Sequence, residues 1–397
     1  MVLWLSLRGS DMPGFTVTSI THGAEGVAEW TYNGSAKLTP KPLRWKPGAA
    51  DAEDAANAVL ATLLPIAVAA GESVKLPYAI AQSSLDFWKA KFAALQRFYV
   101  KPVHVHVYPI MDGAASDRTG DTVGLCYGGG LDSMAVLCDH IKRGIPLHLM
   151  FLRSPESITG STVRCLQAAA DAANTPLAFV DTNAVNLLAE YSRAIYRNVV
   201  SRDPLFLPMA PHRDKGGCSL LPYMFTRGFP FFFAALFGLP SGTRRILYSY
   251  ECNYGPDMGE ARANGFAFYN DVAYRGAALV PFTVGSKTDE LELLRDFPHV
   301  AEHMKSCPSN VVQWCGDCIK CVRMHLLQRT LGMPPIPIYK GAELSRQDSP
   351  GIIGDMMAYY IRHRPNADQE LESILARLLD KSAAWCGGMN YPLKGMR

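Results

Sequence analysis

Three consecutive glycines, Gly128–Gly130, separate a short apolar segment from a helical one, and this arrangement restricts the fold more than any other feature of the chain. The apolar run Thr122–Tyr127 predicts a buried strand, and Asp132–Arg143 predicts a helix directly after the glycines. Glycines at such a turn allow positive φ and let a ligand approach the backbone closely. The segment therefore predicts a strand, a tight loop and a helix in an α/β fold.

The same alternation of strand and helix continues toward residue 250. Short buried strands that alternate with helices imply a parallel sheet covered by helices on both faces. Such a sheet binds ligands beyond the carboxyl ends of its strands. The further predicted strands are Pro146–Leu152, Leu177–Asp181 and Arg245–Tyr250, and the further predicted helices are Val163–Ala173 and Pro230–Gly238.

The segments on either side of this α/β region have a different pattern. We predict an N-terminal α+β module over residues 1–115, an α/β domain over 116–300, and a cysteine-containing segment with a helical tail over 301–397. Residues 111–121 are polar and resemble a linker. In the first module we predict a hairpin from Phe15–Ile20 and Val27–Tyr32, helices at Asp51–Ala70 and Leu85–Tyr99, and a strand at Val103–Tyr108.

The glycine loop has the residues of a phosphate-binding site. Its backbone amides and the start of the following helix form a nest for an anion. Ser133 can donate to a phosphate oxygen, and Asp132 can place a magnesium ion. The alternative is a glycine turn capped by Asp and Ser. The dinucleotide fingerprint does not fit, because Ser133 replaces its last glycine, and the Walker pattern lacks its lysine.

Four of the ten cysteines fall between residues 307 and 321. A Cys-x2-Cys pair in a tight turn lets two thiolates reach one ion, and two further thiolates complete the tetrahedron of a structural Zn²⁺ site. An iron–sulfur cluster is the competing interpretation, because Cys-x2-Cys-x2-Cys also occurs in ferredoxins. The predicted metal ligands are Cys307, Cys315, Cys318 and Cys321.

The loop resembles the PP-loop, Ser-Gly-Gly-x-Asp-Ser, of ATP pyrophosphatases in the adenine nucleotide alpha hydrolase superfamily. Gly128 replaces the first serine of that motif, and Leu131 occupies its variable position. The resemblance implies a doubly wound parallel sheet, ATP and Mg²⁺. It also implies attack of a substrate oxygen on the α-phosphate, release of pyrophosphate, and displacement of AMP by a second nucleophile. The matched residues are Gly129, Gly130, Asp132 and Ser133.

The cysteines extend the resemblance to the 7-cyano-7-deazaguanine synthase family. The match is Cys315-Gly-Asp-Cys-Ile-Lys-Cys-Val-Arg323, with weaker matches at Pro281–Glu290 and at Thr226-Arg227. It covers about residues 120–330. This resemblance implies a small-molecule carboxylate as substrate, which ammonia or another nucleophile converts to an amide and then to a nitrile.

Five residues outside the cysteine cluster complete the predicted site. Glu251 and Asp257 follow the last predicted strand, where they face the nucleotide or form a polar surface loop. Asp181 ends a strand and contacts adenosine or substrate, or caps a helix. Lys287 contacts phosphate or is solvated, and Arg227 binds an anion. The predicted catalytic residues are Asp132, Ser133, Lys287 and Glu251, and the predicted nucleotide-binding residues are Gly128, Gly129, Gly130, Leu131, Asp132, Ser133, Asp181, Arg227 and Asp257.

Two other functions remain open. Gly128, the long N-terminal module and Glu251 are similar to features of the ATP-dependent epimerase of UDP-muramoyl-L-alanyl-L-glutamate, in which adenylation of the terminal glutamate acidifies its α-proton. The other alternative is a non-catalytic nucleotide-binding protein or a partner in nucleic-acid modification, for which the sequence offers no basic patch.

Composition limits the partners. The formal net charge is +3, from 39 basic and 36 acidic residues, so obligatory nucleic-acid binding is not predicted. The apolar run Phe229–Leu239 is too short for a membrane span, and the apolar start of the chain is too short for a signal peptide. We expect a cytoplasmic protein in which Cys126 and Cys138 are core residues. The oligomeric state stays open, a homodimer included.

Overall fold

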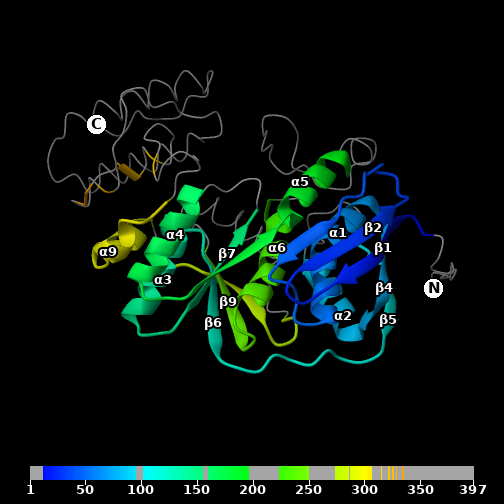
Figure 1. The fold of residues 1–397 in the computed structure, drawn as a ribbon, viewed down its shortest axis with the longest axis horizontal. Helices are drawn as coiled ribbons and strands as arrows, with labels where there is room; N and C mark the ends of the chain where they lie inside the picture. The colour runs from blue at the N-terminus through cyan, green and yellow to red at the C-terminus, as the bar shows by residue number, and fades with distance from the viewer. Residues whose placement is uncertain are drawn as a thin grey trace, which may run out of the picture.

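The computed structural model describes most of the chain up to residue 305 and a few positions beyond it. The described residues form one ten-stranded sheet with helices packed on it (Figure 1). The strand order is β10-β9-β6-β7-β8-β3-β2-β1-β4-β5. The described residues are 12–94, 102–154, 160–195, 223–249, 273–285, 287–305, 314, 321, 324–325, 328 and 333–334.

One half of the sheet is parallel throughout, and it confirms the predicted α/β region. The five strands are β6 (Thr122–Cys126), β7 (His148–Arg153), β8 (Leu177–Thr182), β9 (Thr243–Ser249) and β10 (Ala278–Phe282). Each neighbouring pair in the order β10-β9-β6-β7-β8 runs parallel. The short apolar runs form these strands because both faces of a parallel sheet are buried.

The N-terminal strands continue the same sheet instead of forming a separate one. β3 pairs antiparallel with β8, and β2 pairs antiparallel with β3 and with β1, as the predicted hairpin requires. β1, β4 and β5 run parallel to one another and therefore opposite to β8. The bounds are β1 (Gly14–Thr21), β2 (Gly26–Tyr32), β3 (Leu43–Lys46), β4 (Ser73–Ala81) and β5 (Val107–Met111).

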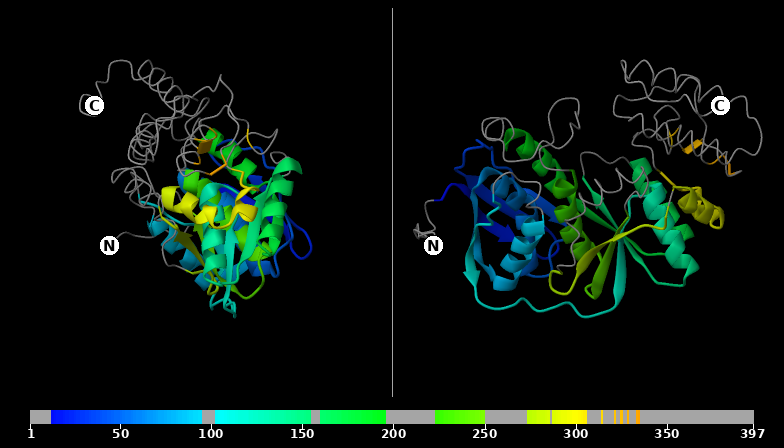
Figure 2. Two further views of the ribbon diagram at one scale, coloured as in Figure 1. Left: turned by 90° about the vertical axis from the view of Figure 1, so that its left-hand side faces the viewer. Right: turned by 180° about the vertical axis from the view of Figure 1, so that it is seen from behind.

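The helices form two layers, one on each face of the sheet (Figures 1 and 2). The first layer packs in one hydrophobic core that extends along the sheet from β5 to β10, and the second packs in another on β7, β6 and β9. The first layer is α1 (Ala52–Ala70), α2 (Gln82–Ala94), α5 (Ala184–Ile195) and α6 (Tyr223–Gly238). The second is α3 (Leu131–Lys142), α4 (Gly160–Ala172), α8 (Lys287–Arg295) and α9 (Pro298–Ala301).

Helix α1 is the central helix of the first layer. Asp51 caps its start by accepting a hydrogen bond from the Asp54 amide at 2.8 Å, and Gly71 ends it in the left-handed conformation. Among the described residues it is the one helix long and apolar enough to cross a membrane, and 89% of that apolar window is buried inside the structure. Its apolar composition is explained by this burial on nearly all sides.

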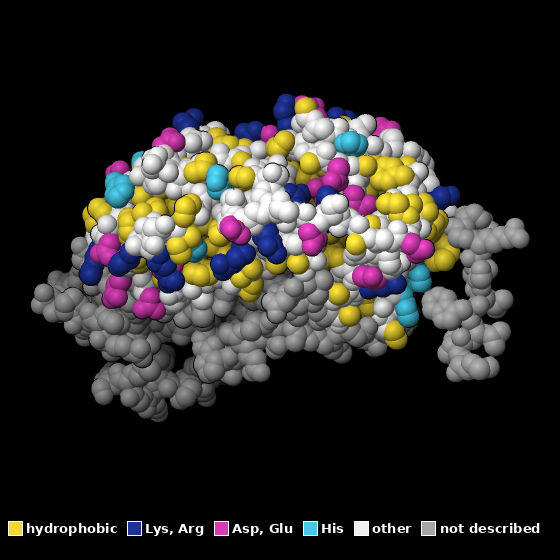
Figure 3. All heavy atoms as spheres, turned by 90° about the horizontal axis from the view of Figure 1, so that it is seen from below, with side chains coloured by type: hydrophobic (Ala, Val, Ile, Leu, Met, Phe, Trp, Pro, Cys, Tyr) yellow, Lys and Arg dark blue, Asp and Glu magenta, His cyan; other side chains and the backbone are white. Residues whose placement is uncertain are grey.

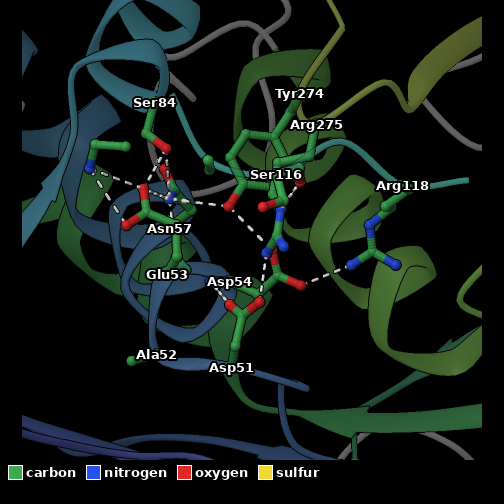
Figure 4. Close-up of polar contacts among 12 residues, drawn as sticks. Asp51, Ala52, Glu53, Asp54, Asn57, Ser84, Ser116, Arg118, Tyr274 and Arg275 are labelled. Atoms are coloured by element: carbon green, nitrogen blue, oxygen red, sulfur yellow. Dashed lines mark hydrogen bonds and ion pairs between the residues drawn. The ribbon is translucent and has the colours of Figure 1, made fainter. Parts of the chain in front are cut away.

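A buried carboxylate at the start of α1 ties the two halves of the chain together (Figure 4). Asp54 is 1% exposed and accepts hydrogen bonds from three side chains. The Nη2 atom of Arg118 lies 2.6 Å from its Oδ2, while Nη1 of Arg275 and the hydroxyl of Tyr274 lie 2.9 and 3.0 Å from its Oδ1. Arg118 precedes β6 and Arg275 precedes β10, so this cluster fixes both segments to α1.

Neighbouring polar groups extend this cluster. Nη1 of Arg275 also donates to Asp51 at 2.6 Å, and its Nε donates to the Ser116 carbonyl at 2.8 Å. The amide of Asn57 donates to the Tyr274 hydroxyl at 3.1 Å and accepts from the Trp88 indole at 2.7 Å. Asp54 and Arg275 thus have several hydrogen-bond partners each, which offsets the cost of removing them from water, whereas Nε of Arg118 is buried without a described partner.

The connector between β5 and β6 runs along the edge of the sheet where β6 begins, at the bottom of Figure 1. Seen from that side, basic and acidic side chains are interspersed over the visible described surface (Figure 3). The mixture agrees with the small net charge of the whole chain.

Some predicted bounds were wrong. The strand predicted at Val103–Tyr108 begins at Val107, because pairing with β4 starts where Val74 faces Val107. The helix predicted from Leu85 begins at Gln82 and is described as far as Ala94. Strands β3, β4 and β10 and helices α5, α8 and α9 were not predicted. The predicted helical tail lies outside the described residues.

We predict that Asp54→Asn destabilises the protein by about 3 kcal/mol, because the substitution leaves two buried guanidinium groups without their shared carboxylate. Urea denaturation followed by circular dichroism measures the change. Lys41→Gln is the matched control, since the Lys41–Glu190 ion pair is also 2.6 Å long but its side chains are 50% and 42% exposed. We expect the control to cost less than about 1 kcal/mol. Equal losses for the two variants would contradict the role assigned to Asp54.

Candidate functional site

The strand order reverses at β6, and this reversal locates the site. After β6 the chain adds β7 and β8 on one side, and then returns to add β9 and β10 on the other. Loops that leave the sheet in opposite directions at such a point open a crevice beyond the carboxyl ends of the strands. The glycine loop leaves β6 at this edge and leads directly into α3. The structure therefore places the predicted phosphate loop at the reversal point.

The loop is closed by its own serine. Gly130 is the N-cap residue of α3, with φ −79° and ψ 171°, and no side chain forms a cap hydrogen bond there. The Ser133 hydroxyl accepts a hydrogen bond from the Gly128 amide at 3.3 Å and donates to the Gly130 carbonyl at 3.2 Å. Ser133 is 4% exposed. The serine thus stabilises the turn by contacts on both sides of it, and it does not act as the N-cap residue.

Gly129 and Gly128 have different surroundings. Gly129 has φ +70°, and a Cβ atom at this position would lie 2.4 Å from Cδ2 of Leu166 in α4. Its carbonyl accepts the Lys305 amide at 2.8 Å. At Gly128 no atom of the described residues, its chain neighbours aside, lies within 4 Å of the Cβ position. Gly129 is therefore required by the packing of α4, whereas space for the serine of the usual motif is open at Gly128.

Asp132 lies in the first turn of α3 and is its one acidic residue there. It is partly exposed, whereas Leu131 beside it is 4% exposed and belongs to the core. A carboxylate beside the positive end of a helix is stabilised, and a carboxylate oxygen is a ligand that Mg²⁺ prefers. The position and chemistry of Asp132 thus fit a magnesium ligand beside bound phosphates.

Asp181 lies at the same edge of the sheet, one strand beyond β7. It pairs in register with Arg153, and both oxygens of its carboxylate accept hydrogen bonds from that guanidinium. The Nη2–Oδ2 distance is 2.6 Å. Asp181 does not cap α5, because it lies within β8 and the Ala184 amide donates to Thr182 instead. The helix-cap alternative for Asp181 is therefore wrong.

Arg153 was missed in the sequence. It is the last residue of β7, and Cζ of its guanidinium lies 5.5 Å from the centre of the Phe179 ring. The ion pair with Asp181 raises the pKa of Arg153 above its ordinary value. The available signal was a single arginine at the carboxyl end of an apolar strand, which is the edge where ligands bind.

The remaining predicted site residues are not assembled by the described residues. Lys287 opens α8 after β10, and Arg227 belongs to α6, but neither side chain is described. Five predicted positions, two acidic residues and three cysteines, lie wholly outside the described residues: Glu251, Asp257, Cys307, Cys315 and Cys318.

Cys321 is the one predicted zinc ligand that the structure describes. It is fully buried and belongs to the same core as Leu291, Leu294 and Met324. Within the described part of the chain no group of three or more histidine, cysteine or acidic residues is placed to hold a metal. The zinc site therefore stays a prediction, with one of its four ligands located in the second core.

Cys126 and Cys138 lie on either side of the loop in sequence, and both are core residues as predicted. Cys126 is 7% exposed at the end of β6, and Cys138 is fully buried in α3. Burial raises the pKa of each thiol to about 12. Both sulfur atoms therefore stay protonated at neutral pH, which does not suit a nucleophile or a sulfur carrier.

The comparison with protein-family models finds no match, and neither does the comparison with curated proteins. Among solved structures, the fold is similar to that of NMN synthetase from Francisella tularensis, with a TM-score of 0.30 and 11% sequence identity. The similarity covers 63% of this chain and 89% of that chain. Values this low assign no function to the chain.

We predict that alanine is harmful at one of two adjacent glycines and tolerated at the other. Gly129→Ala should destabilise the protein by about 1–3 kcal/mol, because it combines a left-handed backbone with a collision against Leu166. Gly128→Ala is the matched control, and we expect a change within about 0.5 kcal/mol. Thermal unfolding of both variants measures the difference. Similar losses at the two positions would show that the packing of α4 on the loop is not as described.

We also predict that iodoacetamide leaves Cys126 and Cys138 unmodified in the native protein at pH 8. Their raised pKa means that the thiolate forms only as the pH approaches about 12, and burial excludes the reagent. Cys165, which is partly exposed on α4, is the internal comparison. Mass spectrometry of tryptic peptides reads out each site, with urea-unfolded protein as the fully labelled reference. Labelling of Cys126 at the reference rate would contradict its place in the core.

Proposed function

We propose that this protein is an ATP-dependent enzyme that adenylates a carboxylate-bearing small molecule and releases pyrophosphate. The observation that carries the proposal is the location of Gly128–Ser133 at the carboxyl edge of the parallel sheet, at the point where the strand order reverses. A glycine turn without a binding role could follow any of the strands, so its location at the reversal point favours a ligand-binding loop. The PP-loop residues Asp132 and Ser133 follow it in the first turn of α3.

In this proposal the loop residues hold the nucleotide phosphates. The loop amides and the positive end of α3 bind phosphate oxygens, and the Gly128 amide becomes available when the Ser133 hydroxyl turns from it to a phosphate. Asp132 holds Mg²⁺, which neutralises charge that develops on the transferred group. Lys287 at the start of α8 and Glu251 after β9 complete the proposed catalytic set, and both follow strands of the parallel sheet.

The fold does not identify the acid substrate, so its identity is a further part of the proposal. We propose a 7-deazaguanine-type acid, activated for attack by ammonia, on the resemblance of the cysteine segment. A terminal glutamate of a peptidoglycan precursor is the alternative. Cys307, Cys315, Cys318 and Cys321 would hold a structural Zn²⁺, and the enzyme would act in the cytoplasm without nucleic acid.

Pyrophosphate release tests the proposal. We expect Mg²⁺-ATP to give pyrophosphate only when one acid is added, either 7-carboxy-7-deazaguanine with ammonia or UDP-muramoyl-L-alanyl-L-glutamate. Asp132→Asn should lower the rate by about 100-fold, as is usual when one electrostatic contact to a developing charge is removed. Asp171→Asn is the control, because Asp171 is exposed on α4 and its carboxylate accepts a hydrogen bond from Gln167 on the same helix.

The alternatives give different results in the same assay. Release with the muropeptide and inversion of its glutamate would replace the deazaguanine substrate by the epimerase reaction. ATP binding without pyrophosphate release for any acid would overturn the enzyme proposal and favour a nucleotide sensor. Equal activity of Asp132→Asn and Asp171→Asn would remove Asp132 from the catalytic set.

A further inference from the structure

Arg153 and Asp181 form an ion pair at the carboxyl edge, on the sheet face that α3 and α4 cover. Arg153 and Asp181 lie two residues after Phe151 and Phe179 on the same strands, so all four side chains share one face of the sheet. Phe151 and Phe179 pack against the second core. Cys126 at the end of β6 pairs with Met150, so β7 extends three residues farther, to Arg153, alongside the glycine loop. The glycine loop and Arg153 thus end neighbouring strands at the same edge of the sheet, which places the arginine one strand away from the strand that carries the proposed phosphate site.

The guanidinium of Arg153 is held on one side and open on the other. Its Nε and Nη2 atoms donate to the two oxygens of Asp181, and the Phe179 ring lies 5.5 Å from Cζ. Nη1 donates to no described residue, and the side chain is 35% exposed. The edge formed by Nη1 and Nη2 therefore presents N–H groups in a fixed orientation, in the fork geometry that binds a carboxylate or phosphate.

The neighbouring charges favour a bound anion. Lys46 faces Asp181 in register across the β3–β8 pair, and its Nζ lies 2.6 Å from Glu25. Arg44 lies two residues before Lys46 on the same exposed side of β3. Lys46 and Arg44 thus add two cations to the row of side chains that contains Asp181 and Glu25, so the carboxylate that orients Arg153 does not make these surroundings net negative.

We propose that Arg153 binds an oxyanion of the ligand beside the glycine loop and that Asp181 is its positioning residue. This inference rests on the proposed function and names a contact that the loop motif does not contain. The oxyanion has two sources, a phosphate of ATP or a carboxylate of the acid substrate. In both cases the ligand occupies the Nη1–Nη2 edge while the pair with Asp181 stays intact.

Chemical modification of arginine distinguishes the sources. The full-length protein is treated with phenylglyoxal, and the rate of adduct formation at Arg153 is followed by peptide mass spectrometry. The ligands added are Mg²⁺ with α,β-methylene-ATP, 7-carboxy-7-deazaguanine, or UDP-muramoyl-L-alanyl-L-glutamate. Arg143 is the internal control, because it also pairs with an aspartate, Asp139, through a single Nε–Oδ1 contact of 3.0 Å, but follows the far end of α3 with its side chain 60% exposed.

Protection of Arg153 by the nucleotide analogue alone identifies phosphate, and protection by an acid identifies carboxylate. Either result supports the inference, provided that Arg143 reacts at an unchanged rate. Unchanged modification of Arg153 with every ligand overturns it. Because the nucleotide arm measures binding, it gives a result even if no acid releases pyrophosphate, so failure of the proposed function is recognised separately.

Substitution supplies a second readout. For the ligand that protects, Arg153→Gln should weaken binding by about 10- to 100-fold, the usual effect of losing a charged hydrogen-bond donor. Arg153→Lys should recover only part of this, because lysine keeps the charge but lacks the fork. Arg143→Gln should leave the affinity unchanged. If Arg153→Gln alters only the unfolding temperature and not the affinity, the pair is structural and the inference is wrong.

Discussion

The pairing of β6 with β7 on one side and β9 on the other determines where chemistry can take place in this molecule. The chain adds later strands first on one side of β6 and then on the other. The connections on the two sides therefore cross opposite faces of the sheet, and the loop after β6 lies at the crevice between them. The same pairing buries β6 on both faces, with Leu125 in one core and Cys126 in the other. The loop is therefore mounted on a strand that cannot shift without disturbing both cores.

Much of the parallel half could be predicted because its strands are short apolar runs separated by helices of ordinary length. The N-terminal half was harder. β3 has four residues between Pro42 and Pro47, too few for its alternation to be distinguished from chance. β4 contains Pro77, which argues against a strand inside a sheet; its pairing with β1 ends at Lys75, and its pairing with β5 shifts in register between Lys75 and Ile80. That β3 joins β8 depends on tertiary packing and has no local signal.

The candidate site likewise has one part that the sequence predicts and one part that it does not. Three glycines followed by Asp132 and Ser133 are a continuous motif, so the sequence predicts both the loop and its place after a strand. Arg153 and Asp181 are separated by a helix and a turn, and each alone resembles an ordinary strand end. Only the register of β7 against β8 brings the guanidinium to the carboxylate. Contacts of this kind are set by pairing between distant segments, which composition and periodicity do not contain.

The junction between β3 and β8 has a consequence for how the protein is made. The Arg44 amide donates to the side chain of Asn183, 139 residues later in the chain. The Asp51 carboxylate accepts from Arg275, 224 residues later. The N-terminal strands leave the ribosome first, with the β3 edge and the buried end of α1 still without their partners. An open strand edge is a template for incorrect pairing. The nascent chain is thus most exposed to aggregation after Lys46 has been synthesised and before Asp181 has been added. A chaperone that covers strand edges during this time would raise the yield of folded protein.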